Sequence, residues 1–253
     1  MADILIKNGM LITMDPARRV IKRGAVAVEK GKISAVGPTR QVEKAHRARK
    51  VIDARGMVVM PGLINTFVNS GTNMAKNIAE HASGVAWRHL MDHILLRSVT
   101  KKFYHVSGEL MALELLKFGT TCFLSKFGTS PRADDPAYAG AHMEGIANVG
   151  IRSVTGVGPF RWPFPEVTSS WRNGKRTDRV VTVEQSFRVV EQLIRKYHGA
   201  HGGRTGVWIG LARMLAPSSI DPMYNPRILK HSVKVSRLVK RLMNKYDVGL
   251  RVN

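Results

Sequence analysis

The strongest constraint on the fold of this chain is a repeated order of strand followed by helix that begins at residue 58. Strand-like apolar segments alternate with segments of helical periodicity; the strands are expected at residues 58–68, 120–126, 152–156, 207–212 and 249–253, and the helices at 100–118, 137–149, 183–198 and 227–246. The pattern Thr182-x-x-Gln185 is typical of a capping box at the start of a helix. Such alternation predicts an α/β fold with a parallel sheet, because parallel strands need long crossover connections.

Residues 1–56 follow a different pattern. Short β-rich pieces are separated there by turn-forming dipeptides, namely Asn8-Gly9, Asp15-Pro16, Lys30-Gly31 and Gly37-Pro38. Such spacing predicts a small antiparallel sheet. We therefore expect two domains, with residues 1–56 forming a β-sheet part and residues 57–253 forming the α/β part.

The segment 57–69, MVVMPGLINTFVN, carries the most chemical information. Phe67 and Asn69 are two residues apart, so on a strand both side chains project to the same side. Two imidazoles at this spacing would form one edge of a zinc or iron site, but a phenyl ring offers no ligand and a carboxamide offers a poor one. We expect no catalytic metal at this position.

This segment resembles a strand of the amidohydrolase superfamily that reads close to V-x-P-G-L-I-N-x-H-x-H. The similarity is greatest to the branch that contains chlorohydrolases, hydroxyatrazine hydrolase and the deaminases of cytosine, guanine and adenosylhomocysteine. Further segments resemble that branch in the same order and extend the resemblance over essentially the whole chain: ADILIKNGMLITMD at 2–15, GKISAVGP at 31–38, KFGTTCFLSKF at 117–127 and GIRSVTG at 150–156. The resemblance implies a β-sandwich part followed by a (β/α)8 barrel whose first strand binds a metal.

The resemblance also implies that the barrel is partial. Five strands are expected here, whereas a closed barrel of this class has eight. The segment DVGLRVN at 247–253 resembles the fifth strand of the family, which commonly ends in H-x-H, and it places Asn253 where a third metal-binding His would stand. Phe67, Asn69 and Asn253 are then vestigial ligand positions that line a pocket, and no cofactor is expected.

The charge of the chain is unusual. Its 253 residues include 40 Lys and Arg against 18 Asp and Glu, a formal net charge of +22, with the excess in residues 1–56 and 151–253. A field of this sign favours an acidic partner subunit, a polyanion or an anionic substrate. The single cysteine and the lack of a signal peptide or a membrane-spanning apolar run are typical of a cytoplasmic protein.

The helix expected at 227–246 carries a basic stripe, formed by Lys230, Lys234, Arg237, Arg241 and Lys245. We interpret the stripe as a partner-binding surface or as the solvated face of a barrel helix. Nucleic acid is a weaker interpretation because no nucleic-acid motif accompanies the charge. His89 and His93, four residues apart, could share a metal ion, but no third ligand is identifiable and a surface role is favoured.

The leading hypothesis is a metal-free, catalytically degenerate amidohydrolase-like subunit that supports a homologous or complementary, and by charge acidic, partner subunit in a hetero-oligomer. One alternative is a subunit that contributes part of the pocket to a two-chain metal-dependent hydrolase acting on C–N or C–Cl bonds of a small nitrogenous compound. A second is a basic polyanion-binding module, and a third is a truncated fragment. The chain is not expected to be an active enzyme alone.

Overall fold

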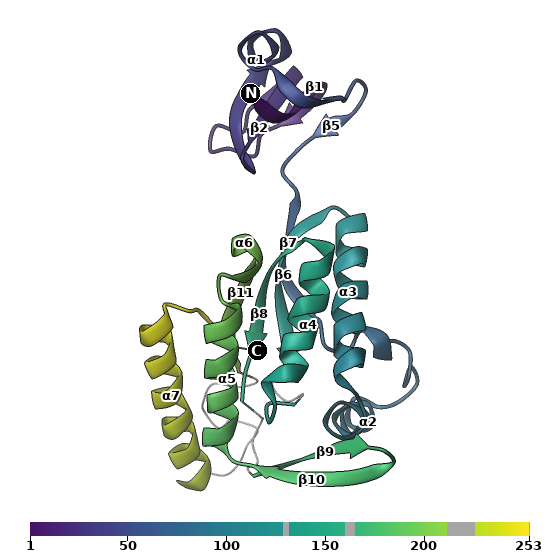
Figure 1. Ribbon diagram of the computed structural model, residues 1–253, viewed down its shortest axis with the longest axis vertical. Coiled ribbons are helices and arrows are strands. Elements are labelled where there is room, and N and C mark those ends of the chain that lie inside the picture. Colours follow the sequence, from purple (N-terminus) through teal and green to yellow (C-terminus); the bar gives the residue numbers. More distant parts are fainter. Residues whose placement is uncertain (129–131, 160–164, 212–225, 253) are drawn as a thin grey trace. The chain divides into compact units, whose positions relative to one another are not determined.

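The structure is a computed structural model that describes residues 1–128, 132–159, 165–211 and 226–252 (Figure 1). The chain forms two compact units, Met1–Gly62 and Leu63–Asn253. None of the helices in these described ranges has an apolar stretch long enough to cross a lipid bilayer.

The first unit is a five-stranded sheet with one helix. Its elements are β1 (Ala2–Ile12), β2 (Val20–Glu29), β3 (Lys32–Pro38), α1 (Thr39–Ala45), β4 (Ala48–Asp53) and β5 (Val58–Val59). β1, β2 and β3 pair antiparallel, as expected, but β4 and β5 both pair with β1 in parallel. The prediction of a purely antiparallel sheet is therefore wrong. The chain crosses over through α1 before it enters β4, and a crossover of this kind brings the next strand in parallel.

The second unit contains a parallel five-stranded sheet that curls into a half-barrel. Its strands are β6 (Leu63–Asn69), β7 (Thr120–Gly128), β8 (Arg152–Val157), β11 (Thr205–Leu211) and β12 (Leu250–Val252), in the order β12-β11-β8-β7-β6. The α/β class and the partial, five-stranded barrel predicted from the sequence are confirmed. β6 and β12 are the two edge strands of the described sheet.

Four helices cover the outer face of this sheet: α3 (Lys101–Lys117), α4 (Pro136–Val149), α5 (Val183–Tyr197) and α7 (Pro226–Tyr246). Of the shorter elements, η1 (Asn73–Ala75) packs on α3, α2 (Gly84–Arg97) contacts β9, and α6 (Ala200–Gly203) contacts β11. α3, α4, α5 and α7 lie side by side in that order (Figure 1). The predicted capping box is present at α5, where Thr182 Oγ1 accepts from the Gln185 N–H and the Gln185 side chain accepts from the Thr182 N–H.

The packing of the helices shows which strand residues face the barrel interior. Phe127 of β7 and Ile209 of β11 are buried in one apolar cluster with Tyr104 of α3, so they face the helices. Neighbouring residues on a strand alternate between faces. Lys126 and Gly210 therefore lie on the opposite side, which we call the inner face of the half-barrel.

Two sequence expectations need correction. The single strand expected at 58–68 is divided into β5 and β6, with residues 60–62 outside both strands. Pro61 has no N–H to donate to a sheet, which explains the break. No strand was expected between residues 156 and 183, but the structure forms a hairpin there from β9 (Glu166–Arg172) and β10 (Lys175–Val181). Residues 161–164 lie outside the described residues.

Candidate functional site

The two residues singled out by the sequence, Phe67 and Asn69, lie at the carboxyl end of β6. Both are exposed, and both line an open cavity of about 390 Å³ between β6, η1 and α3. The Phe67 N–H donates to Asn65 Oδ1 at 3.0 Å, where the pairing of β6 with β7 shifts register. The local bulge therefore helps to turn the end of the strand, and the structure brings the two residues into one cavity as expected.

The cavity has one acidic wall residue, Glu114 of α3, which already has partners in the chain. Its carboxylate pairs with Lys76 Nζ at 2.7 Å and accepts from Asn73 Nδ2 at 3.3 Å. The hydrogen bond from Lys76, followed by that from Asn73, lowers the pKa of Glu114. A carboxyl with a lowered pKa stays ionised near neutral pH, so Glu114 is a poor general acid.

A guanidinium contacts the other predicted residue, Phe67. Arg251 of β12 is only 8% exposed, and its Cζ lies 4.4 Å from the centroid of the Phe67 ring. Its Nη1 is buried and has no hydrogen-bond partner within the described ranges. Burial lowers the pKa of Arg251, but a guanidinium keeps its proton in proteins. A buried cation therefore lies on the ring of Phe67.

The side chain of Arg251 connects the two edges of the sheet. Arg251 pairs with Gly210 of β11, and its Cδ lies 3.8 Å from the position that a Cβ on Gly156 of β8 would occupy. A Cβ at Gly156 would also lie 3.2 Å from the backbone oxygen of Ser125, a tight contact. The arginine stem therefore passes over a glycine on its way from β12 to Phe67 on β6.

The residues of this region do not fit a catalytic metal ion. Phenyl, carboxamide and guanidinium groups are not ligands that zinc or iron prefers, and a guanidinium repels a dication. The five strands of the half-barrel contain no Asp, Glu or His between their described ends. No group of three His, Cys, Asp or Glu that could hold a metal occurs in the part of the chain that the structure describes. Asn253, the third predicted ligand position, lies outside that part.

Among the described residues, the histidine pair on α2 offers no alternative metal site. His89 and His93 are both exposed on this helix. Two imidazoles without a third ligand do not complete a protein metal site.

The predicted basic stripe lies on α7, and part of it contacts α5. Lys234 pairs with Glu184, and Lys245 pairs with Glu191 at 2.9 Å. The other three stripe residues are exposed; they are Lys230, Arg237 and Arg241. The stripe thus divides into residues with a partner on α5 and residues available to an external partner, and whether a partner binds them stays a prediction.

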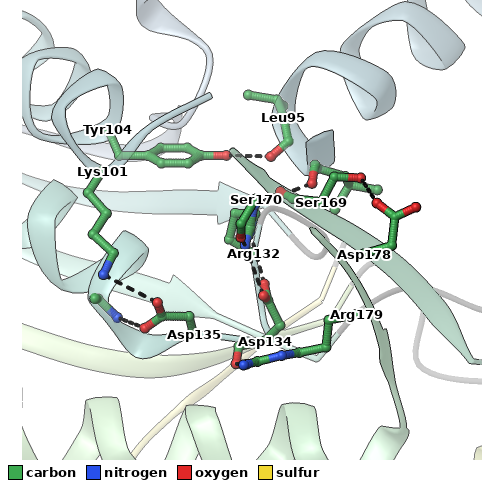
Figure 2. A network of polar contacts seen from close by, with 12 residues as sticks. Leu95, Lys101, Tyr104, Arg132, Asp134, Asp135, Ser169, Ser170, Asp178 and Arg179 are labelled. Carbon is green, nitrogen blue, oxygen red and sulfur yellow. Dashed lines mark hydrogen bonds and ion pairs between the residues drawn. The ribbon is translucent and has the colours of Figure 1, made fainter. Parts of the chain in front are cut away.

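Sequence reasoning did not find a second buried arginine, Arg132, which follows β7 (Figure 2). Its Nε and Nη2 donate to the two carboxylate oxygens of Asp134, each at 2.9 Å, and Nη2 also donates to Ser170 Oγ at 2.9 Å. Nη1 donates to the backbone oxygen of Ser169, and the guanidinium lies 4.1 Å from the Tyr138 ring centroid. This network fixes the β9–β10 hairpin to the end of β7, so Arg132 is an anchor of the fold.

Arg251 was also missed, although a signal existed. It stands two residues before Asn253, so both residues project to the same side of a strand. The alignment that placed Asn253 at a ligand position therefore placed Arg251 at the neighbouring one. Arg132 has no comparable signal, because its partners on β9 are more than 30 residues away in the sequence.

Comparison with known proteins places these observations in context. No protein family model matches the chain. It is 39% identical over 213 residues to a 5'-deoxyadenosine deaminase of Methanosarcina acetivorans, a match that covers 83% of this chain and 42% of that relative. It is 28% identical over 198 residues to a 5-methylthioadenosine/S-adenosylhomocysteine deaminase of Syntrophobacter fumaroxidans, covering 78% of this chain and 40% of that relative.

Solved structures show the same fold. An adenosine deaminase from Xanthomonas campestris with bound zinc superposes with a TM-score of 0.73 at 18% identity, over 100% of this chain and 49% of that one. The chain spans less than half the length of each of these three proteins.

Proposed function

Since this chain belongs to the amidohydrolase superfamily, we propose that it is a metal-free, catalytically degenerate member that associates with a partner subunit and supports it. The deaminase relatives and the shared fold support the superfamily assignment. The further steps, loss of the metal and dependence on a partner, rest on the residues at the carboxyl end of β6 and on the exposed edge of that strand.

The contact between Arg251 and Phe67 carries the proposal. In the family pattern that segment 57–69 resembles, two His stand at the positions of Phe67 and Asn69 and bind the metal. Here a guanidinium lies 4.4 Å from the phenyl ring at the first of these positions. Hydrolysis by this superfamily depends on water activated by a metal ion. In this chain a guanidinium and a phenyl ring stand where metal ligands would be needed. We therefore expect no hydrolysis by this chain alone.

The edge of the half-barrel supports the need for a partner. Large apolar side chains are exposed on β6 and at the end of α3, with Leu63 at 52%, Ile64 at 71% and Phe118 at 82% exposure. An edge strand with exposed apolar groups is normally paired or covered. In our proposal a second polypeptide covers this edge, and the net charge of +22 favours an acidic one.

The cavity at β6 favours a second candidate function. In this alternative, the chain contributes a pocket wall to a two-chain hydrolase whose metal is held by the partner. Phe67 and Asn69 would then contact the substrate, with the ring available to stack on a heterocycle and the carboxamide available to donate and accept hydrogen bonds. The deaminase relatives suggest a purine nucleoside as the substrate of such a complex.

The experiment that separates these functions measures metal and activity on the same sample. The purified chain is incubated with zinc, freed of excess ion and assayed for bound zinc and for ammonia release from 5'-deoxyadenosine. We expect neither stoichiometric zinc nor ammonia. Zinc together with ammonia release contradicts the proposal, and ammonia release that appears only when the native partner is added supports the two-chain hydrolase.

The partner itself is tested by isolation of the chain from its native source. A hetero-oligomer in native mass spectrometry is the expected result. A folded monomer without a partner would contradict the supporting role and leave the metal-free character intact.

A further inference from the structure

We infer that the inner face of the half-barrel binds an oxyanion, a carboxylate or phosphate group of a small molecule, at the guanidinium of Arg251. The inference rests on the proposed metal-free character of the site, because a dication and the guanidinium would repel each other. It goes further in naming a ligand class and the residue that would bind it.

The first argument is the missing acceptor at Arg251. A buried polar group without a partner costs about 1–3 kcal/mol, and more if the group is charged. The buried guanidinium of Arg132 has acceptors for all of its nitrogens, whereas Nη1 of Arg251 has none within the described ranges. An oxyanion supplies an acceptor and the compensating charge that Arg251 lacks among the described residues.

The second argument is the charge of the sheet. Near Arg251, the strands of the half-barrel carry Lys126 and, within their described residues, no carboxylate. Lys126 is in register with Asn69 and Gly156, so it lies at the level where the stem of Arg251 crosses the sheet. A carboxylate or phosphate that enters the inner face therefore meets a positive field, strengthened by the low local dielectric.

The third argument is access and shape. Phe67 is 57% exposed and Asn69 is exposed, so the ring that lies on the guanidinium is itself open to solvent. A guanidinium recognises two oxygens on one centre through parallel N–H donors, which suits carboxylate and phosphate. Because Nη1 is covered by the chain itself, we expect the Phe67 ring to move aside when the anion binds.

The test is calorimetric titration of the full chain with inorganic phosphate and, separately, with benzoate, at constant ionic strength. We expect saturable binding at one site. Arg251→Met should weaken that binding at least about tenfold, equivalent to about 1.4 kcal/mol. Arg152→Met is the matched control, because it removes an exposed arginine from the same sheet; its affinity should equal that of the wild type.

The two anions distinguish the sources of the ligand. Binding of phosphate alone identifies a phosphate ester as the ligand class, binding of benzoate alone identifies a carboxylate, and binding of both supports the shared chemistry. Absence of saturable binding of either anion, or equal binding by the wild type and Arg251→Met, overturns the inference.

Two further measurements guard against a variant that does not fold. Arg251→Lys keeps the charge but loses the paired donors, so it should bind about tenfold more weakly; equal affinity contradicts paired recognition. Phe67→Leu removes an exposed ring and should bind at least as tightly as the wild type, and loss of binding there contradicts the site. A wild-type chain that binds neither zinc nor oxyanion overturns only this inference, whereas stoichiometric zinc overturns the proposed function beneath it.

Discussion

Among the described residues of the second unit, two arginines are buried, and they differ in whether the chain completes their hydrogen bonds. Arg132 donates to a carboxylate, a hydroxyl and a backbone oxygen (Figure 2). Arg251 lies on the Phe67 ring with a buried Nη1 that has no acceptor within the described ranges. Both guanidiniums lie over an aromatic ring, at 4.1 Å from Tyr138 and 4.4 Å from Phe67, so the ring contact does not distinguish them.

This difference in hydrogen bonding indicates which of the two residues stabilises the fold. A buried charge whose partners are all present stabilises the fold. Removal of one partner leaves the other as an uncompensated buried charge, which is strongly destabilising. A buried charge without a partner makes no stabilising network of this kind. Its burial calls for another explanation, such as a bound ligand. Substitutions at both arginines and at two other partly or fully buried groups test this contrast.

The largest effect is expected from Arg132→Met. The side chains of Arg132 and Asp134 are 1% and 3% exposed, so the variant leaves a buried carboxylate without its counterion. We expect the free energy of unfolding to fall by about 3–5 kcal/mol, measured by urea denaturation. The additional change Asp134→Asn should restore part of this loss because it removes the uncompensated charge.

The matched control for this variant is Arg176→Met. Arg176 and Asp178 form the same two-oxygen contact at the same spacing in the sequence, but on the surface, with distances of 2.7 and 2.9 Å. Exposed pairs of this kind contribute little to stability. Equal destabilisation by Arg132→Met and Arg176→Met would contradict the role assigned to burial.

The second prediction concerns His142 of α4, a buried group that, unlike an arginine, can lose its charge. His142 is fully buried, its Nδ1 lies 3.1 Å from the Tyr104 backbone oxygen, and Nε2 has no partner among the described residues. Burial, with a smaller contribution from the charge of His105, lowers the pKa of His142 to about 4. The unfolded chain has a His pKa of about 6.5, so it takes up a proton at a higher pH than the folded chain.

Stability should therefore be complete above about pH 6.5 and should fall as the pH is lowered toward 4. Between pH 7.5 and 5 this group removes about 2 kcal/mol from the free energy of unfolding. His142→Gln should abolish most of this slope when both proteins are compared by urea denaturation. If the variant keeps the pH dependence of the wild type, His142 is not the group that causes it.

A smaller effect is expected from Arg251→Met. The variant loses the contact with Phe67, worth about 0.5–2 kcal/mol, and also removes an incompletely paired buried charge. These changes oppose each other, so the free energy of unfolding should lie within about 1 kcal/mol of the wild type. A loss as large as that of Arg132→Met would show that Arg251 has partners that stabilise the fold.

A comparably small effect is expected from Glu191→Gln, which tests the junction of α5 with α7. Hydrogen bonds from Tyr246 at 2.6 Å and Lys245 at 2.9 Å lower the pKa of Glu191 to about 2. This contribution is present above the unfolded pKa of about 4.5 and is lost as the pH falls toward 2. Because the side chain is 20% exposed, we expect a loss of about 1 kcal/mol at pH 7, reduced in high salt. An unchanged melting temperature of Glu191→Gln at low salt would contradict this stabilising role of Glu191.

The sequence predicted the half-barrel well because its signals are local. Helical periodicity located α3, α4, α5 and α7 to within about two residues, and the pattern at Thr182 and Gln185 located the start of α5. The error at residues 58–68 arose where an apolar run continued through Pro61. The hairpin β9–β10 was missed because every residue of β10 except the last is exposed, so the strand lacks the apolar pattern of a buried one.

The candidate site was only half predictable. Phe67 and Asn69 were identified by their spacing on one strand, and the structure places them in one cavity. The contact of Phe67 with Arg251 joins residues on opposite edges of the sheet and depends on Gly156 between them. Contacts between residues so distant in sequence follow from the curvature of the sheet, which no local pattern encodes.

The most direct test of the central claim is a crystal structure grown with zinc and measured above the zinc absorption edge. A metal-free site predicts no anomalous peak beside Asn69 and a guanidinium of Arg251 lying on the Phe67 ring. A peak about 2.1 Å from the Asn69 side chain, within the range of zinc–oxygen bonds, with Arg251 displaced from the ring, would contradict it.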